Sequence, residues 1–485
     1  MILSSIRNFW GRFKQMMSTD FSEQVKKTLG GQNMVSDTMM SAIEEWIEMY
    51  MDKAPWIKDD VKSAGIPAVI CSEVARLVTL EMDVRITGSP HADFLSKQFD
   101  LIRDNLRVDT EYACAGGGIV FKPYVYGNEI YTEVIQANDF YPTSFTNSKI
   151  TGASFIYRTW KGDRLYTRIE HHEMETEQYH ITNRAYVSKG EDSLGKECSL
   201  TDVEEWQEIK PEVFIAGLKS PLFAYFRIPI GNTIDVKSPL GVSVYARGKN
   251  HIREADEQYG RFLWEYEGGE LAIDVSSDMF KTQNGKPELP KGKERLYRAN
   301  ELDAATAKGT DLMKAWAPQL RDEAFIRGLN RILMLIENDC SLSRGTLSDP
   351  DLVAKTATEI ITMKQRFAAQ VKDIQKSFQT ALDDLIYAYS MIASLYDLAP
   401  DGEYTVAYDW DDSIAIDSEA ERMRDQQEVA AGLMLPYEYR VKWYHEDEAT
   451  AKKKLMSQEP TDDDILGFDY DEPEPKEGKQ REGNR

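Results

Sequence analysis

The longest uninterrupted helical pattern in this 485-residue chain lies between Asp351 and Ala399, and it limits the possible folds most strongly. No Gly or Pro interrupts it, and its apolar residues recur every three or four positions, which predicts one amphipathic helix. The apolar stripe consists of Phe367, Val371, Ile374, Phe378, Leu382, Leu385 and Tyr389. At about 1.5 Å per residue, such a helix is roughly 60–70 Å long. Its apolar face needs neighbours to cover it, so we expect a spine that other elements pack against.

Shorter patterns divide the rest of the chain into helical and β-rich parts. Apolar spacing predicts helices over 37–51, 66–81, 94–113, 242–267 and 321–339, with two more over 417–456. Short runs of β-branched and aromatic residues predict an antiparallel meander from about 116 to 230, an irregular and weakly β segment over 270–318 and a strand over 403–410. The expected fold class is therefore α+β, and we find no internal repeat.

The two ends of the chain differ from its middle. Residues 2–13 form a short basic amphipathic pattern, which predicts a docking arm or, alternatively, a membrane-surface helix. They lack the pattern of a secretory signal, and no apolar run reaches the length of a membrane span. The segment 459–485 has ten acids, four bases and three prolines, so we expect a disordered acidic tail.

Charge and cysteine content narrow the function classes. Lys and Arg number 58 against 82 Asp and Glu, giving a net charge of −24. Phosphate binding depends on Lys and Arg, so a protein that coats DNA is not expected. The four cysteines, Cys71, Cys114, Cys198 and Cys340, form no CxxC pair, and we expect reduced core thiols and folding in a reducing compartment.

The sequence contains no convincing motif for binding a nucleotide phosphate. The chain has no GxxxxGK[ST] sequence, so a P-loop is not expected. The Gly-rich run between Ala113 and Tyr124 has the order helix, glycines, strand. A dinucleotide-binding motif needs the order strand, glycines, helix, so we predict a tight helix-to-strand turn instead.

Candidate metal and catalytic clusters are equally weak. His171, Glu173 and Glu175 fall on one face of a predicted strand and His172 on the other, with His180 further along, so their side chains do not converge as metal ligands must. His91, His251 and His445 are isolated, which argues against a catalytic triad. The acidic runs at 409–413 and 462–464 fit either solvated faces or divalent-cation ligands, and solvated faces are the simpler interpretation. We therefore expect no cofactor, no metal and no catalytic residue.

Several short strings, in a fixed order, resemble the portal (head-to-tail connector) proteins of tailed bacteriophages, most closely the type found in siphophages of Gram-positive hosts. The resemblance extends from about residue 35 to 455. The strings are Trp46 and Tyr50 followed by Pro55-Trp56; Gly116-Gly117-Gly118 before Ala137 to Phe145; Ser238-Pro239-Leu240-Gly241 with Ser243 and Tyr245; and Ser343-Arg344-Gly345-Thr346 before Lys355 to Glu359. The last two strings are the most specific.

The resemblance implies a multidomain subunit that assembles into a ring, usually of twelve copies, at one vertex of the capsid. With the arm and the tail added, the expected parts are an N-terminal arm (1–35), an α/β wing (36–237), a first stem helix (238–267), a clip (268–318), a second stem helix (319–340), a tunnel loop (341–352), a long wing helix with a strand (353–416), an α-helical crown (417–456) and the tail (457–485).

The resemblance also implies two groups of site residues. The tunnel loop is expected to face DNA through the polar residues Ser341, Ser343, Arg344, Gly345, Thr346 and Ser348, with Arg344 as the phosphate contact. The clip is expected to face terminase or a head-tail adaptor through the basic residues Lys286, Lys291, Lys293, Arg295 and Arg298. A merely solubilising loop explains those basic residues equally well.

The implied partners are other copies of the chain, double-stranded DNA bound without sequence preference, the large terminase, a head-tail adaptor, and the major capsid and scaffolding proteins. The implied location is the virion, with assembly in the host cytoplasm and no membrane association. An acidic chain suits a channel through which DNA slides, because it neither reads bases nor grips phosphates. Two alternatives stay open: a capsid-associated scaffold or adaptor that is not a channel, and a metal-dependent or covalent enzyme with a scattered active site, which predicts a defined pocket with perturbed acids.

Overall fold

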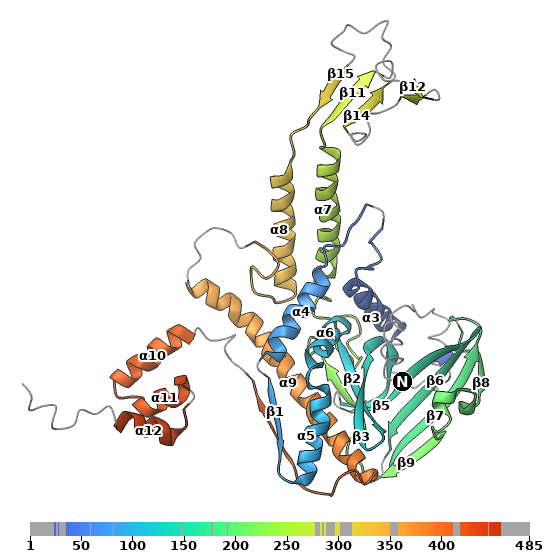
Figure 1. Cartoon of the computed structure of the whole chain (residues 1–485), viewed down its shortest axis with the longest axis vertical. Coiled ribbons are helices and arrows are strands. Elements are labelled where there is room, and N and C mark those ends of the chain that lie inside the picture. Colours follow the sequence, from blue (N-terminus) through green and yellow to red (C-terminus); the bar gives the residue numbers. More distant parts are fainter. Residues whose placement is uncertain are drawn as a thin grey trace, which may run out of the picture. The chain divides into compact units, whose positions relative to one another are not determined.

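The computed structural model divides the chain into two compact units, one from Met1 to Ile414 and one from Ala415 to Arg485. It describes residues 24–25, 28, 35–58, 60–80, 82–146, 149–175, 178–191, 193–276, 282–283, 286–287, 296–300, 313–349, 357–410, 418–444 and 446–456. The amphipathic segment over 2–13 and the acidic tail over 459–485 lie outside these residues. The mixture of helices and sheets in the described chain confirms the α+β class (Figure 1).

Four helices lie between residues 37 and 116: α3 (Asp37–Tyr50), α4 (Ile66–Thr79), α5 (Pro90–Arg103) and α6 (Leu106–Gly116). The Ser36 hydroxyl caps α3 by accepting a hydrogen bond from the Met39 amide at 3.3 Å, and Ser89 caps α5 in the same way. The first two helices confirm the predictions to within two residues. The prediction of one helix over 94–113 is wrong: the helix breaks at Asp104 and Asn105, whose side chains compete for backbone hydrogen bonds and favour turns.

The predicted meander is confirmed as an antiparallel sheet in the order β4-β5-β6-β7-β8, with β9 also paired to β7. Its strands are β4 (Phe140–Thr146), β5 (Lys149–Lys161), β6 (Arg164–Met174), β7 (Gln178–Ser188), β8 (Lys196–Cys198) and β9 (Glu212–Ala216). A second sheet has the order β10-β2-β3, with β2 (Gly118–Tyr126), β3 (Glu129–Gln136) and β10 (Ala224–Arg227). The predicted late strand is confirmed as β16 (Thr405–Asp409), which pairs antiparallel with β1 (Asp83–Thr87).

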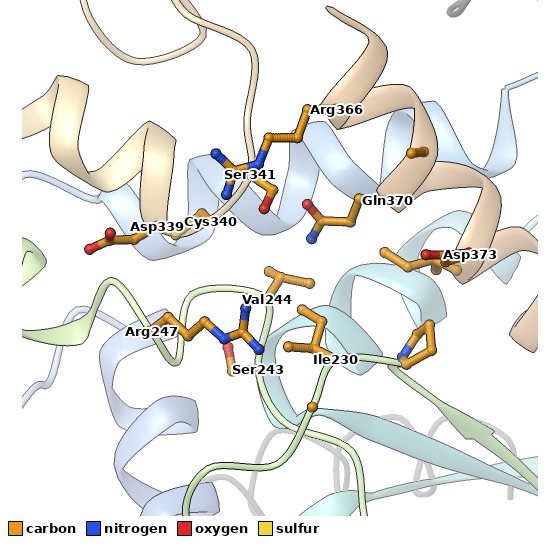
Figure 2. A pocket seen from close by; sticks show the side chains of 14 residues that line it. Ile230, Ser243, Val244, Arg247, Asp339, Cys340, Ser341, Arg366, Gln370 and Asp373 are labelled. Atoms are coloured by element: carbon orange, nitrogen blue, oxygen red, sulfur yellow. The ribbon is translucent and has the colours of Figure 1, made fainter. Parts of the chain in front are cut away.

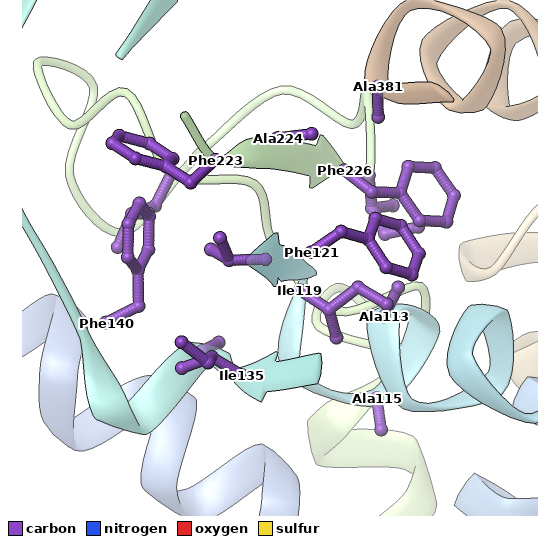
Figure 3. Close-up of a cluster of buried hydrophobic side chains, with 14 of the residues drawn as sticks. Ala113, Ala115, Ile119, Phe121, Ile135, Phe140, Phe223, Ala224, Phe226 and Ala381 are labelled. Carbon is purple, nitrogen blue, oxygen red and sulfur yellow. The ribbon is translucent and has the colours of Figure 1, made fainter. Parts of the chain in front are cut away.

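The long helix α9 (Ala357–Leu395) has 39 residues, and its apolar face lies in the core of the first unit. At its centre the ring of Phe378 stacks on Phe226 at 4.5 Å and on Phe121 at 6.4 Å between centroids. Figure 3 shows Phe121 and Phe226 of the second sheet below Ala381 of α9. At about 1.5 Å per residue the helix is about 58 Å long, so the predicted spine is confirmed, slightly shorter than expected.

The Gly-rich run is the predicted helix-to-strand turn. Gly116 ends α6, Gly117 has a left-handed φ of 87°, and Gly118 opens β2. A Cβ atom on Gly117 would lie 2.6 Å from the carbonyl oxygen of Gly241, so only glycine fits here. The turn brings the end of α6 against the segment that leads into α7.

Two antiparallel helices, α7 (Lys249–Gly268) and α8 (Asp322–Asp339), lie side by side and extend from the body of the first unit toward a small sheet (Figure 1). The prediction that α7 starts at residue 242 is wrong. The Ser243 hydroxyl and the Val244 amide both donate to the carbonyl oxygen of Cys114, so this segment is fixed to α6 in an irregular conformation before the helix begins.

Between α7 and α8 the described residues form short strands, in agreement with the weakly β pattern predicted there. One sheet has the order β14-β11-β15, formed by β11 (Ala272–Ser276), β14 (Tyr297–Asn300) and β15 (Met313–Trp316). The pair β11–β14 is parallel and the pair β11–β15 is antiparallel. A separate short hairpin pairs β12 (Thr282–Gln283) with β13 (Lys286–Pro287).

The second unit contains α10 (Ser418–Ala430), α11 (Pro436–Tyr444) and α12 (Glu448–Met456). Three helices replace the two predicted, because the chain turns again near Glu446 and Asp447 between α11 and α12. The carboxylate of Glu446 accepts hydrogen bonds from Arg440, and that of Asp447 accepts one from the Thr450 amide at 2.9 Å. The Asp425 carboxylate is buried and accepts a hydrogen bond from the Trp443 indole.

Two further expectations concern the burial of the cysteines and the absence of a membrane span. All four cysteines are free thiols; Cys71, Cys114 and Cys340 are buried, but Cys198 is partly exposed at the end of β8, so the expectation of a core thiol is wrong for that residue. Among the described residues, no helix combines the length and the apolar character that a membrane span requires.

Candidate functional site

The segment that follows α8 turns back along the helix. Ser341 has a left-handed φ of 57°, and its amide donates to the carbonyl oxygen of Asn338. The next amide, that of Leu342, donates to the carbonyl oxygen of Glu337 at 2.8 Å. This pair of bonds is the Schellman motif that ends many helices, and it reverses the chain direction here. We call residues Ser341–Asp349 the return loop.

A single buried side chain, Glu337, holds the centre of the return loop. Its exposed fraction is 1%. One carboxylate oxygen, Oε1, accepts hydrogen bonds from the amides of Gly345 at 3.0 Å, Leu347 at 2.8 Å and Ser348 at 2.9 Å. The other, Oε2, accepts the hydroxyl of Ser348 at 2.9 Å. Four donors thus meet one carboxylate, which compensates for its removal from water.

A second polar side chain of α8 holds the end of the loop. The Asn330 carbonyl accepts a hydrogen bond from the Asp349 amide at 2.8 Å, and its amide group donates to the Asp349 carbonyl at 3.3 Å. Asn330 and Glu337 are seven residues apart and therefore lie on the same face of the helix. Sequence reasoning missed both residues, although two polar residues two turns apart on an apolar helix were a readable signal.

The structure brings the six predicted tunnel-loop residues together in the return loop, but in different environments. Gly345 is exposed and has a φ of 90°, a left-handed conformation that glycine adopts readily. The expectation of a solvent-facing hydroxyl is wrong for Ser348, which is buried against Glu337. The Thr346 hydroxyl donates to the carbonyl oxygen of Ser343 at 2.7 Å. Ser341 and Ser343 are partly exposed.

Arg344, the predicted phosphate contact, is partly exposed. Its Nη1 atom is buried and has no hydrogen-bond partner within the described part of the chain. A buried nitrogen is out of reach of an external anion, so only the exposed part of this side chain can meet one. This position keeps Arg344 as the best cation of the loop for an external anion.

A cavity of about 300 Å³ lies beside the return loop, where α8, α9 and the segments before α7 and after β10 meet. Figure 2 shows Arg247 and Arg366 on opposite sides of it, with Ser341 and Gln370 between them. The guanidinium of Arg366 donates to Asn338 at 2.8 Å, and Asp339 at the end of α8 contacts His251 at 2.7 Å. Charges of both signs therefore surround the cavity.

The titratable groups that line this cavity can be compared with the perturbed acids that the enzyme alternative predicts. Burial raises the pKa of Cys340, which lines the cavity, to about 12, so this thiol is protonated and a poor nucleophile. The carboxyl groups with pKa values raised to about 7 by burial, Glu44 and Asp109, do not line it. Within the ranges that the structure describes, no three His, Cys, Asp or Glu side chains are grouped as metal ligands.

The histidine-rich strand β6 is part of a buried ionic cluster. The side chains alternate as predicted, since His171 contacts Glu173 and His172 contacts Glu170. The Glu170 carboxylate also meets Lys122 at 2.7 Å. Burial opposes ionisation of Glu170, but Lys122, His172 and Arg168 outweigh it and hold the pKa of Glu170 well below its usual range.

Only two of the five predicted clip residues belong to the described part of the chain. Lys286 lies in β13 and Arg298 lies in β14, which belong to two separate small sheets. Lys291, Lys293 and Arg295 lie outside the described residues. A shared basic patch in the clip is thus a prediction that these strands leave untested.

Comparisons with known proteins can now be set beside this geometry. Residues 100–462 match the family model described as "Phage portal protein, SPP1 Gp6-like". No curated protein matches the chain. Two similar solved structures are chains of "Neck of native GTA particle computed with C12 symmetry" and "Neck of empty GTA particle computed with C6 symmetry", each with a TM-score of 0.38. The first has 10% identity and covers 82% of this chain and 92% of its own; the second has 11% and covers 84% and 93%.

The family match covers well over half of the chain and includes α7, α8, the return loop and α9. It also covers the meander and the three described helices of the second unit, so it does not rest on one local motif. The family is one of structural proteins rather than enzymes. This chain belongs to the SPP1 Gp6-like family of phage portal proteins.

Proposed function

We propose that this chain is the subunit of a portal ring at one capsid vertex, through whose channel DNA is packaged and later ejected. The family match over 100–462 is the observation that carries this proposal. In the ring, α7 and α8 form the stem, residues 268–318 the clip, residues 341–352 the tunnel loop and residues 417–456 the crown. Twelve copies at 55.4 kDa have a mass of about 665 kDa.

The exposed charges of the stem helices support passage of DNA without gripping. On α7 the Glu257 carboxylate lies 3.9 Å from Arg253 and 3.7 Å from Arg261, and on α8 Arg327 lies 3.9 Å from Glu323. Such mixed surfaces neither concentrate positive charge on phosphates nor present a fixed pattern to base edges. A duplex can slide past them.

The return loop is the proposed constriction. It follows the end of α8 and carries one cation, the partly exposed Arg344. In a ring this arginine recurs once per subunit, which gives weak and repeated contacts with phosphates. The loop contains no aromatic residue that would stack on bases.

Partner docking completes the proposal. The clip contacts the large terminase during packaging and a head-tail adaptor afterwards, and the subunit meets the major capsid and scaffolding proteins as it assembles in the host cytoplasm. The basic residues of the clip, of which Lys286 and Arg298 lie in described strands, are the proposed contacts. Loss of terminase binding in a ring with both residues changed to Glu would support this assignment, and unchanged binding would remove it.

Two measurements test the channel itself. Native mass spectrometry of the purified protein should give a ring near 665 kDa, whereas only monomer or dimer at micromolar concentration would contradict the proposal. In proheads, the Arg344→Glu ring should package less DNA or lose it, because a carboxylate repels phosphate. The matched control is Arg164→Glu, at the exposed start of β6. Normal filling by the Arg344→Glu ring would remove the loop from the mechanism.

A further inference from the structure

We propose that Glu337 is the positioning residue of the return loop, the side chain that fixes the conformation of its centre and thereby the place of Arg344. This inference rests on the proposed function only for its effect on DNA, since the geometry stands on the contacts of one subunit. Glu337 is not expected to touch DNA itself, because its exposed fraction is 1%.

The contacts of Glu337 differ from ordinary helix-end packing. The loop residues Gly345, Leu347 and Ser348 direct three successive or near-successive amides to a single oxygen, Oε1. Amides of an irregular segment point in many directions unless an acceptor collects them, and each buried amide without an acceptor is costly. Glu337 therefore determines the course of the loop rather than filling a space beneath it.

No cation neutralises this carboxylate among the described residues, so its compensation comes from the loop amides and the Ser348 hydroxyl. That makes the dependence mutual: the loop needs the carboxylate as an acceptor, and the carboxylate needs the loop as a source of donors. Asn330 holds only the end of the loop, at Asp349. With Glu337 removed, the chain from Ser341 to Ser348 keeps its Schellman turn at one end and Asn330 at the other. Its centre then keeps only the local hydrogen bonds from Thr346 to the Ser343 carbonyl oxygen.

Arg344 lies within this centre, directly before Gly345. Gly345 has a φ of 90°, a conformation that glycine adopts readily and other residues adopt rarely, and its amide is the first of the donors to Glu337. The direction of Arg344 is therefore fixed by the bond at the following residue. A loop released from Glu337 still contains Arg344 but no longer presents it at one defined place around the channel.

Hydrogen–deuterium exchange on the assembled ring, resolved to single amides, tests the inference without DNA. In Glu337→Ala we expect the amides of Gly345, Leu347 and Ser348 to exchange about tenfold faster or more, because hydrogen bonds to a charged acceptor are lost. Glu337→Gln keeps one acceptor oxygen and should give a smaller increase at the same amides. Glu323→Gln makes the same chemical change at a side chain of α8 that is 87% exposed, and should leave the loop unchanged.

Two results would overturn the proposal. Unchanged exchange at the three amides would show that the loop conformation does not depend on Glu337. An equal increase along the whole of α8 in both variants would show that Glu337 supports the helix rather than the loop.

A packaging assay on the same rings separates this inference from the proposed function. If loop exchange rises in Glu337→Ala and DNA is lost, both stand. If loop exchange rises but proheads fill and retain DNA normally, Glu337 positions the loop and the loop is not the constriction, so the proposed role of the loop fails alone.

Discussion

Glu170 in the meander and Glu337 near the end of α8 are both buried carboxylates, but the two regions compensate for them in opposite ways. Glu170 lies among cations, with Lys122 at 2.7 Å and Arg168 at 3.0 Å, and it also contacts His172. Glu337 has no cation beside it in the described structure and is surrounded by amides of the return loop.

The difference follows from what holds each region in place. The partners of Glu170 stand on strands β2 and β6, whose ladders fix their positions whether or not the charges are present. The partners of Glu337 belong to an irregular loop that has no ladder. Charges in the meander thus depend on the fold, whereas the fold of the loop depends on a charge. Substitutions in the meander should therefore lower the stability of the protein, whereas substitutions at the loop should mainly change the conformation of the loop.

The largest expected effect is that of Glu170→Gln. It leaves Lys122 and Arg168 buried without a counter-charge, and breaking a buried pair in this way costs roughly 3–5 kcal/mol. We expect a large fall in the thermal midpoint of the purified protein. Glu205→Gln, whose carboxylate forms only a surface pair with Lys161 at 3.6 Å, is the control and should be nearly neutral. A midpoint for Glu170→Gln close to that of the control would break the comparison.

Asp109 on α6 provides a third case, because its carboxyl group is buried with neither a cation nor a side-chain hydrogen bond among the described residues. Burial raises its pKa to about 7. A raised folded-state pKa means that stability is fully present below the unfolded value near 3.8 and is lost as the pH rises through about 7. This loss amounts to at most about 4 kcal/mol.

Asp109→Asn removes that ionisation, so the difference in stability between the variant and the natural chain measures its effect. The variant should gain stability over the natural chain as the pH rises from 4 to 7, and the gain should level off above pH 7. Thermal midpoints of both rings at pH 4, 5.5, 7 and 8 provide the measurement, with the other titrating groups cancelling between them. A difference that stays constant with pH would show that Asp109 ionises as freely in the folded protein as in the unfolded one.

Asn330→Ala should have a smaller and local effect. It removes two hydrogen bonds to Asp349 and leaves the bonds of Glu337 in place, so we expect a loss of about 1 kcal/mol. Exchange should rise at the Asp349 amide and stay low at Gly345 and Leu347. Equal release of all three amides would mean that the loop opens as one unit and that Glu337 has no separate role.

The smallest expected effect is a gain in stability on replacing Ser341. Ser341 has a φ of 57°, a conformation that favours glycine, so Ser341→Gly should stabilise the turn by roughly 0.5–1 kcal/mol. Ser343→Gly, two residues further on, lacks a left-handed φ and serves as the control. A destabilised Ser341→Gly ring would mean that the Ser341 side chain, which lines the cavity, contributes more than its backbone costs.

The sequence predicted a structural element well where its contacts lie within one segment, and poorly where they join distant parts of the chain. The stripe of α9 and the alternation in β6 predicted these elements well, because periodicity within one segment decides them. The start of α7 was missed because Ser243 and Val244 bond to Cys114, about 130 residues away. The same holds for the site: residues Ser341 to Ser348 were recognised as one polar loop, but their amides converge on Glu337 only after the chain has reversed at Ser341.

A cryo-electron microscopy reconstruction of the purified ring tests the central claim most directly. The account predicts a closed ring of identical subunits in which residues Ser341–Asp349 form the narrowest part of a central channel, with Glu337 turned away from the channel and bonded to the loop. A ring whose narrowest part is formed by other residues, or a particle without a channel, would contradict it.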